Sequence, residues 1–131
     1  MNFTMALAVS ATEPAMTLYG IKNCDTVKKS RAWFAGRGID MSFHDLRADG
    51  LQPEVLRRWL AAVGAERLVN RNGTTWRALT PEQQAIADDD ALVALLLAKP
   101  TLIRRPVVEI GDAVAVGFVP DRWAQLRETE A

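Results

Sequence analysis

Residues 17–26 read TLYGIKNCDT, an apolar run that gives way to polar residues within a few positions. The short apolar run at 17–21 predicts a buried strand. Asp25 or Thr26 is expected to cap the helix that follows, which runs to about Ala35 and ends at the glycines that come next. A strand followed this closely by a helix places Cys24 in the turn between them, at the start of the helix.

The rest of the chain continues the alternation of strand and helix. Residues 42–46 (SFHDL) alternate between polar and apolar side chains and predict a second strand. Two apolar runs, 107–110 and 113–118, flank Gly111-Asp112, which is a two-residue hairpin signal. A last short helix is expected from Asp121 to about Arg127.

The middle of the chain is predicted to be helical. Apolar side chains recur at helical spacing through residues 56–63, and Thr80-Pro81 and Asp88 mark two further helix starts. The predicted order is strand, helix, strand, helical block, hairpin and helix. This order describes one α/β domain over residues 16–131, preceded by an extension, 1–15, that is expected to be disordered.

The composition excludes several classes of function. The 131 residues carry 16 basic and 16 acidic side chains, so net charge gives no general attraction to nucleic acid or membranes. A chain with one cysteine cannot form an internal disulfide or a Cys-only metal site, and we predict no metal. The lone histidine, His44, lies in a predicted strand and is expected to be structural. No span or secretion signal is evident, so a cytoplasmic location is expected.

Cys24 is the candidate nucleophile. A cysteine at a helix N-terminus meets free backbone N–H groups and the positive end of the helix dipole, which favour the nucleophilic thiolate. Lys22, Lys28 and Lys29 add positive charge nearby. The alternative is a buried, inert cysteine, the common fate of a lone one. Polar neighbours on both sides of Cys24 argue against burial.

The residues around this cysteine make the chain recognisable. Residues 20–29 (GIKNCDTVKK) resemble the opening of the arsenate reductase (ArsC)/Spx family, in particular its YffB-type subgroup. The resemblance continues through FHDLR at 43–47, LVN at 68–70, TWRAL at 75–79 and PTLIRRPV at 100–107, and ends with VGF at 116–118. It covers nearly everything after the N-terminal extension. The family implies a thioredoxin-like fold: a mixed four-stranded sheet with a helical insertion between the second and third strands.

The resemblance also implies roles for residues outside the cysteine turn. Arg77 and Arg105 correspond to two arginines that arsenate reductases place around the cysteine, where guanidinium suits an oxyanion or carboxylate. Arg77 is expected to follow a flexible loop, whereas Arg105 precedes Pro106, which takes the place of the cis-proline of thioredoxin-like folds. The site residues implied are Cys24, Arg77 and Arg105 as catalytic residues, with Lys22, Asn23, Thr26 and Pro106 binding the substrate.

Two departures from the family pattern decide between its activities. Arsenate reductases carry a third arginine that is followed by proline, and here Val119 stands before Pro120. Spx regulators carry a Cys-x-x-Cys switch, and here Val27 takes the place of its second cysteine. The YffB-type subgroup lacks both features.

The resemblance to the YffB-type subgroup therefore implies a glutathione-dependent thiol reductase, here with one nucleophilic cysteine. Glutathione is expected as co-substrate rather than bound cofactor, glutaredoxin as a further partner, and the protein as a monomer without nucleic-acid or membrane partners. Arsenate reductase and an Spx-like protein-binding regulator remain the alternatives.

Overall fold

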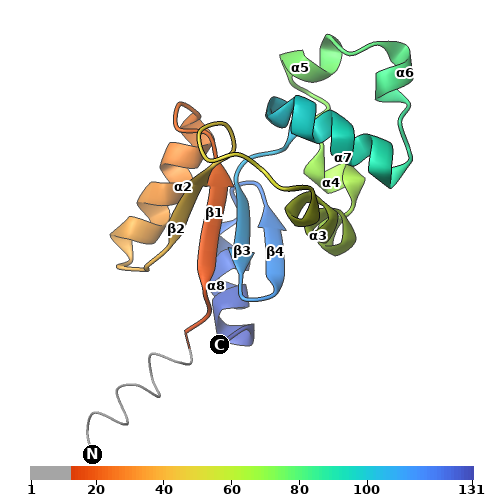
Figure 1. Ribbon diagram of the computed structural model, residues 1–131. Helices are drawn as coiled ribbons and strands as arrows, with labels where there is room; N and C mark the ends of the chain where they lie inside the picture. The colour runs from red at the N-terminus through yellow and green to blue at the C-terminus, as the bar shows by residue number, and fades with distance from the viewer. Residues whose placement is uncertain (1–12) are drawn as a thin grey trace, which may run out of the picture.

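A computed structural model describes residues 13–131, and most of the predicted extension therefore lies outside the described residues. Four strands form one sheet in the order β2-β1-β3-β4 (Figure 1). The strands are β1 (Met16–Gly20), β2 (Ser42–Asp45), β3 (Val107–Ile110) and β4 (Ala113–Val116). Strand β1 pairs in parallel with β2 and antiparallel with β3, and β3 pairs antiparallel with β4. The mixed four-stranded sheet predicted from the sequence is thus confirmed.

Most of the helices lie between the second and third strands, as expected. Before the insertion comes α2 (Asp25–Gly36), and after β4 comes α8 (Pro120–Thr129). The insertion contains α3 (Pro53–Val63), α4 (Ala65–Leu68), α5 (Thr74–Arg77), α6 (Pro81–Gln84), α7 (Asp89–Ala98) and the 3₁₀ turn η1 (Pro100–Leu102). Figure 1 shows α5, α6 and α7 gathered beyond one end of the sheet, the end at which the β1–α2 connection also lies. No helix among residues 13–131 is long and apolar enough to cross a membrane.

Local signals placed several of these boundaries correctly. Thr80 caps α6 in a capping box with Gln83, and the carboxylate of Asp88 accepts the amide of Ala91 at the start of α7. Gly111 adopts a φ of 56°, the left-handed conformation that the predicted hairpin turn requires.

Two boundaries differ from the prediction. The N-cap of α2 is Cys24 itself rather than Asp25 or Thr26, and its side chain makes no capping hydrogen bond. Strand β4 ends at Val116 instead of continuing to residue 118, because Gly117 takes a φ of 87° and turns the chain away from the sheet.

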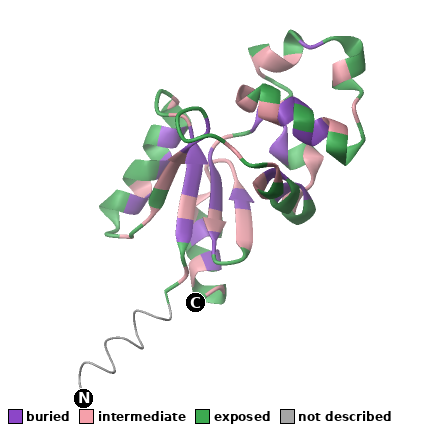
Figure 2. Cartoon of the chain, in the orientation of Figure 1, coloured by how far each residue is buried: buried purple, intermediate pink, exposed green. Residues whose placement is uncertain are grey.

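The sheet has a separate apolar core on each face. Helices α2 and α8 cover one face, where Phe34 and Trp123 pack with ring centroids 4.8 Å apart. Helices α3 and α7 contribute to the core on the other face, which contains the fully buried Trp59. Figure 2 shows buried segments concentrated along β1 and β3, the two central strands. Because both faces are covered, the ends and edges of the sheet remain for function.

A polar network joins α3 to the sheet. The carboxylate of Glu109 accepts hydrogen bonds from the Tyr19 hydroxyl (2.9 Å), the Trp59 indole N–H (3.1 Å) and the Arg58 guanidinium. Burial, reinforced by the bond to Glu109, raises the pKa of Tyr19 to about 12. The network thus joins β1, β3 and α3 through one carboxylate, with the Tyr19 hydroxyl as one of its donors.

Close packing of α2 on β1 depends on a glycine. A Cβ added at Gly20 would lie 2.6 Å from Val27 Cγ2, and Val27 is fully buried. We expect Gly20→Ala to lower the free energy of unfolding by about 1–3 kcal/mol, because the added methyl forces α2 off the strand. Urea unfolding followed by tryptophan fluorescence measures the change.

The chain offers a control and a rescue for this prediction. Gly36→Ala adds the same methyl to α2 where no atom lies within 4 Å, and it should leave stability unchanged or raise it. Adding Val27→Ala to Gly20→Ala removes the colliding methyl groups and should recover part of the loss. Equal stability of the Gly20→Ala and Gly36→Ala proteins would contradict the steric explanation.

Candidate active site

Cys24 lies where β1 passes into α2. Its N–H donates to the carbonyl of Ile21 (3.2 Å) and closes a turn, and its carbonyl accepts the amide of Lys28 (3.0 Å) in the first turn of the helix. The residue is half-buried and packs against the apolar core shared by α2 and α8. Cys24 is thus neither fully buried, as an inert core cysteine would be, nor fully exposed.

The electrostatic setting follows from the N-cap position. Helix α2 begins at the next residue, so its first free N–H groups and the positive end of its dipole lie beside the thiol. Lys22, Lys28 and Lys29 are exposed around it, and the Lys29 ammonium sits 4.2 Å from the centroid of the Phe118 ring. The Asp25 carboxylate, in the first turn, partly offsets this field.

Asp45, at the end of β2, fixes the turn that carries the cysteine. Its Oδ2 accepts the backbone N–H of Lys22 (3.1 Å), and its Oδ1 accepts those of Arg47 (2.8 Å) and Ala48 (2.9 Å). The side chain is buried, and these bonds, that from Ala48 above all, hold the pKa of Asp45 below the ordinary aspartate value. Sequence patterns do not single out Asp45, because its contact with Lys22 spans 23 residues.

Pro106 adjoins the same turn. The Arg105–Pro106 peptide bond is cis, as the resemblance implied. Strands β1 and β3 pair Tyr19 with Val107, so the next position along the ladder sets Pro106 beside Gly20, where the cysteine turn begins. Pro106 is buried, and its carbonyl accepts the amide of Gly117 (2.8 Å).

Arg105 is held firmly next to this proline. Its guanidinium donates to the carbonyls of Thr101 (3.0 Å) and Ile103 (3.2 Å). Its Nε is buried and has no hydrogen-bond partner among the described residues. The side chain is therefore preorganised, with donor capacity still free.

Arg77 is placed differently from the prediction. It does not follow a flexible loop: it is the last residue of α5, a helical turn that begins after Gly73. Its guanidinium is exposed and donates to the carbonyl of Asn72 (2.7 Å). The hydroxyls of Thr75 and Thr101, 2.8 Å apart, join α5 to the 3₁₀ turn η1. Arg105 contacts the same turn through its hydrogen bond to the Thr101 carbonyl. The two arginines thus sit on neighbouring elements.

The remaining predicted residues stay predictions as ligand contacts. Lys22, Asn23 and Thr26 expose their side chains along the turn and first residues of α2. Neither Arg77 nor Arg105 makes a hydrogen bond to Cys24 in the part of the chain that the structure describes. His44 contacts the Gly50 carbonyl through Nε2 at 2.6 Å, which agrees with the structural role expected for it.

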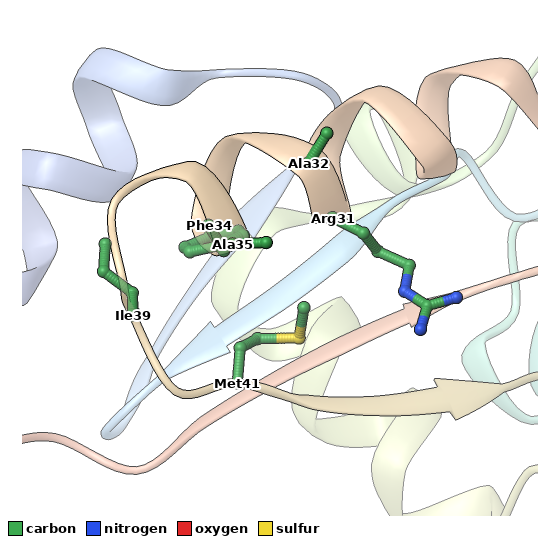
Figure 3. Close-up of a pocket in the computed structure, with 6 residues that line it drawn as sticks. All are labelled: Arg31, Ala32, Phe34, Ala35, Ile39 and Met41. Carbon is green, nitrogen blue, oxygen red and sulfur yellow. The ribbon is translucent and has the colours of Figure 1, made fainter.

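The hollow at the end of α2 lacks comparable chemistry. It has a volume of about 360 Å³ and lies between the last turns of α2 and the chain leading to β2, where Phe34, Ala35, Ile39 and Met41 gather (Figure 3). Arg31, also on its rim, lies over the Phe43 ring at 4.1 Å. This hollow is at the opposite end of α2 from Cys24. Within residues 13–131, no group of three or more His, Cys, Asp or Glu side chains could hold a metal ion.

Comparison with known proteins agrees with this arrangement. The model of the ArsC family matches residues 19–126, which include the whole sheet except the first residues of β1. The chain belongs to the ArsC family.

Several known proteins are similar to this chain over most of their length. An uncharacterised protein of Haemophilus influenzae is 40% identical over 103 residues, covering 79% of this chain and 90% of that protein. A solved structure of a YffB protein is 44% identical with a TM-score of 0.81, covering 86% of this chain and 99% of the other. An arsenate reductase (ArsC) related protein from Brucella melitensis is 43% identical with a TM-score of 0.68, covering 85% and 92%. These matches support the ArsC and YffB-type resemblance and the thioredoxin-like fold.

Valine stands at the two positions where the sequence departs from the arsenate reductases and from the Spx regulators. Val119 is the N-cap of α8 and packs at the rim of the core on which Cys24 also packs. Val27, three residues after Cys24 and within α2, is fully buried against β1. The first valine offers no donor to an oxyanion, and the second leaves Cys24 without a thiol partner in its own helix.

Proposed function

We propose that this protein is a thiol oxidoreductase in which Cys24 is the nucleophile and glutathione the co-substrate. The observation that carries the proposal is the position of Cys24: half-buried, at the N-cap of α2, beside the cis-proline and among exposed lysines. Helix N-termini with nearby lysines are typical surroundings of reactive cysteines, and a half-buried residue remains open to a small disulfide. Membership in the ArsC family supports cysteine chemistry at this turn.

The reaction balances with one chain thiol and external glutathione. The Cys24 thiolate attacks the glutathione sulfur of a glutathione mixed disulfide, the old S–S bond breaks, and the substrate leaves as a thiolate. A glutathione thiolate then attacks the Cys24-bound glutathione, which releases Cys24 and oxidised glutathione. In sum, the glutathione mixed disulfide and one glutathione are converted into the free substrate thiol and one molecule of oxidised glutathione.

Intact mass spectrometry tests the first step. After exposure to oxidised glutathione, the wild-type protein should gain one glutathione moiety, and reduced glutathione should remove it. The Cys24→Ser protein should gain nothing and should have no turnover with a glutathione mixed disulfide. An adduct that forms but is not released by reduced glutathione would contradict the reductase cycle, and absence of an adduct would contradict the nucleophile itself.

Arsenate reduction is the enzymatic alternative, and Val119 argues against it. Loss of one charge-assisted donor pair costs about 2–3 kcal/mol, so turnover of arsenate should be tens- to hundredsfold below that of an enzyme with all three arginines. Val119→Arg should raise the rate measured with glutathione and glutaredoxin. Efficient arsenate turnover by the wild-type protein would show that Arg77 and Arg105 suffice.

The regulator alternative makes a different prediction. An Spx-like module would bind RNA polymerase and would need no turnover of disulfides. Val27 removes the Cys-x-x-Cys switch from this chain, which favours the enzymatic proposal. Retention of purified polymerase on the immobilised protein, together with absence of disulfide turnover, would favour the regulator.

A further inference from the structure

Strand β4 is the last strand of the sheet, so one side of its backbone has no strand partner. Ile110 and Ala113 face each other across the two-residue turn, and such a flanking pair exchanges the ladder hydrogen bonds. Bonded pairs recur at every second position. Four residues farther along each strand, this pattern reaches the pair Pro106 and Gly117. That pair is bonded as expected, because the amide of Gly117 donates to the carbonyl of Pro106 at 2.8 Å.

This alternation determines which groups of β4 are free. Val114 and Val116 lie opposite Glu109 and Val107 at the positions between the bonded pairs. Their N–H and C=O groups therefore point away from β3, toward the open edge of the sheet. Both residues are only half-buried, whereas Ala115 between them is buried.

A hollow of about 410 Å³ opens over this edge, and we call it the β4 groove. Val114, Ala115 and Val116 form part of its lining. Val63, from the end of α3, and Val119, at the start of α8, line it as well. The groove thus offers the strand edge together with apolar contacts from helices on both faces of the sheet.

Three arginines from separate elements surround the β4 groove. Arg67 comes from α4, Arg104 from the segment before β3 and Arg122 from the first turn of α8, and no acidic side chain lines the groove. All three are exposed, and none takes part in the ion pairs found among residues 13–131. Because the whole chain has no net charge, this is a local concentration of positive charge.

We propose that the β4 groove binds an extended acidic segment of a partner protein, which adds to the sheet as a fifth strand. The free groups of Val114 and Val116 would pair with the segment's backbone, and Arg67, Arg104 and Arg122 would bind its carboxylates. A second copy of this chain is a poor occupant, because two β4 edges would bring six arginines together. A small anion would leave the strand edge unpaired. This proposal goes beyond the thiol chemistry and does not depend on Cys24.

A labelled peptide tests the charge requirement. The probe is a fluorescein-labelled seven-residue peptide of alternating Glu and Val, followed by anisotropy, with the same peptide carrying Lys for Glu as comparison. The double variant Arg104→Glu/Arg122→Glu should bind the acidic peptide at least about tenfold more weakly than the wild type. Arg37→Glu, an equal charge reversal of an exposed arginine outside the groove, should bind as the wild type does. Circular dichroism verifies that each variant is folded.

Amide hydrogen exchange tests the strand pairing. Saturating acidic peptide should slow exchange at Val114 and Val116, while Ala115, already paired with β3, should change little. The proposal is overturned if the wild type does not bind the acidic peptide, or if the Lys peptide binds equally well. It is also overturned if binding leaves exchange at Val114 and Val116 unchanged, or if inorganic phosphate displaces the peptide at the peptide's own concentration, since the groove would then be a small-anion site.

Discussion

Asp45→Asn is expected to lower the free energy of unfolding by about 2 kcal/mol at neutral pH. Asparagine has the same shape and can keep one oxygen toward the amides of Arg47 and Ala48. Its NH₂ group must then face the N–H of Lys22, so a donor meets a donor at a buried position. Chemical denaturation measures the loss, and faster exchange of the Lys22 amide should locate it in the cysteine turn.

The pH dependence of this difference checks its cause. The pKa of Asp45 is lower in the folded protein than in the unfolded chain. Its stabilisation is therefore fully present above the unfolded value and is lost as pH falls through the folded value. The gap between wild type and Asp45→Asn should narrow in acid, because the wild-type carboxyl then becomes neutral too.

Asp49→Asn is the matched control for the cysteine turn. Asp49 is exposed, and its Oδ2 accepts the amide of Asp45 (2.8 Å), so it belongs to the same bend without touching Lys22. Its replacement should leave exchange of the Lys22 amide unchanged. If both variants loosen Lys22 equally, the bend as a whole, and not the Asp45 carboxylate, holds the cysteine turn.

Arg105→Ala is expected to slow the reaction of Cys24 with oxidised glutathione by about ten- to hundredfold, the effect of losing a charge-assisted contact. The Arg105 guanidinium is already fixed by Thr101 and Ile103, so little side-chain freedom is lost when an anion binds. Arg77 is exposed and has one backbone partner, so Arg77→Ala should have a smaller effect. Arg105→Lys should rescue poorly, since an ammonium cannot offer two parallel donors.

A second reagent separates the roles of the two arginines. Iodoacetamide is uncharged, so its rate with Cys24 reports the thiol and not the binding of carboxylates. Arg105→Ala should slow both reagents, whereas Arg77→Ala should slow oxidised glutathione alone. Arg71→Ala, which removes another exposed arginine near α5, should alter neither rate. If neither Arg77 nor Arg105 affects either reagent, both are surface charges and the site is confined to the cysteine turn.

Local signals in the sequence predicted most of the fold. The Gly111-Asp112 turn, the Thr80 capping box and the Asp88 cap each involve residues within a few positions of one another, so their chemistry can be recognised without tertiary information. The cap of α2 was missed because Asp25 and Thr26 are strong capping types and Cys24 is not. The close approach of Val27 to Gly20, which lets α2 pack on β1, is a tertiary contact that such local capping signals do not reveal.

The site was predicted less completely than the fold. Cys24 could be recognised from its neighbours in the sequence and the cis bond before Pro106 from the family resemblance, whereas Asp45 reaches Lys22 across the parallel β1–β2 pair. Arg77 was expected on a loop because short helical turns such as α5 have little periodicity to detect. The β4 groove was not foreseen, because its arginines come from three distant segments that only the folded chain brings together.

The burial of Val27 against β1 has a consequence for how oxidation is recorded. A protein with two neighbouring thiols can store a two-electron oxidation internally, with the loss of only two hydrogens. Here the buried side chain of Val27 occupies the position of such a partner, and the chain has one sulfhydryl. Oxidation of Cys24 therefore cannot be stored as a disulfide within the chain, and any disulfide at Cys24 must attach a small thiol or another polypeptide. The chemical identity of the group attached to Cys24 therefore shows with which molecule this thiol last reacted.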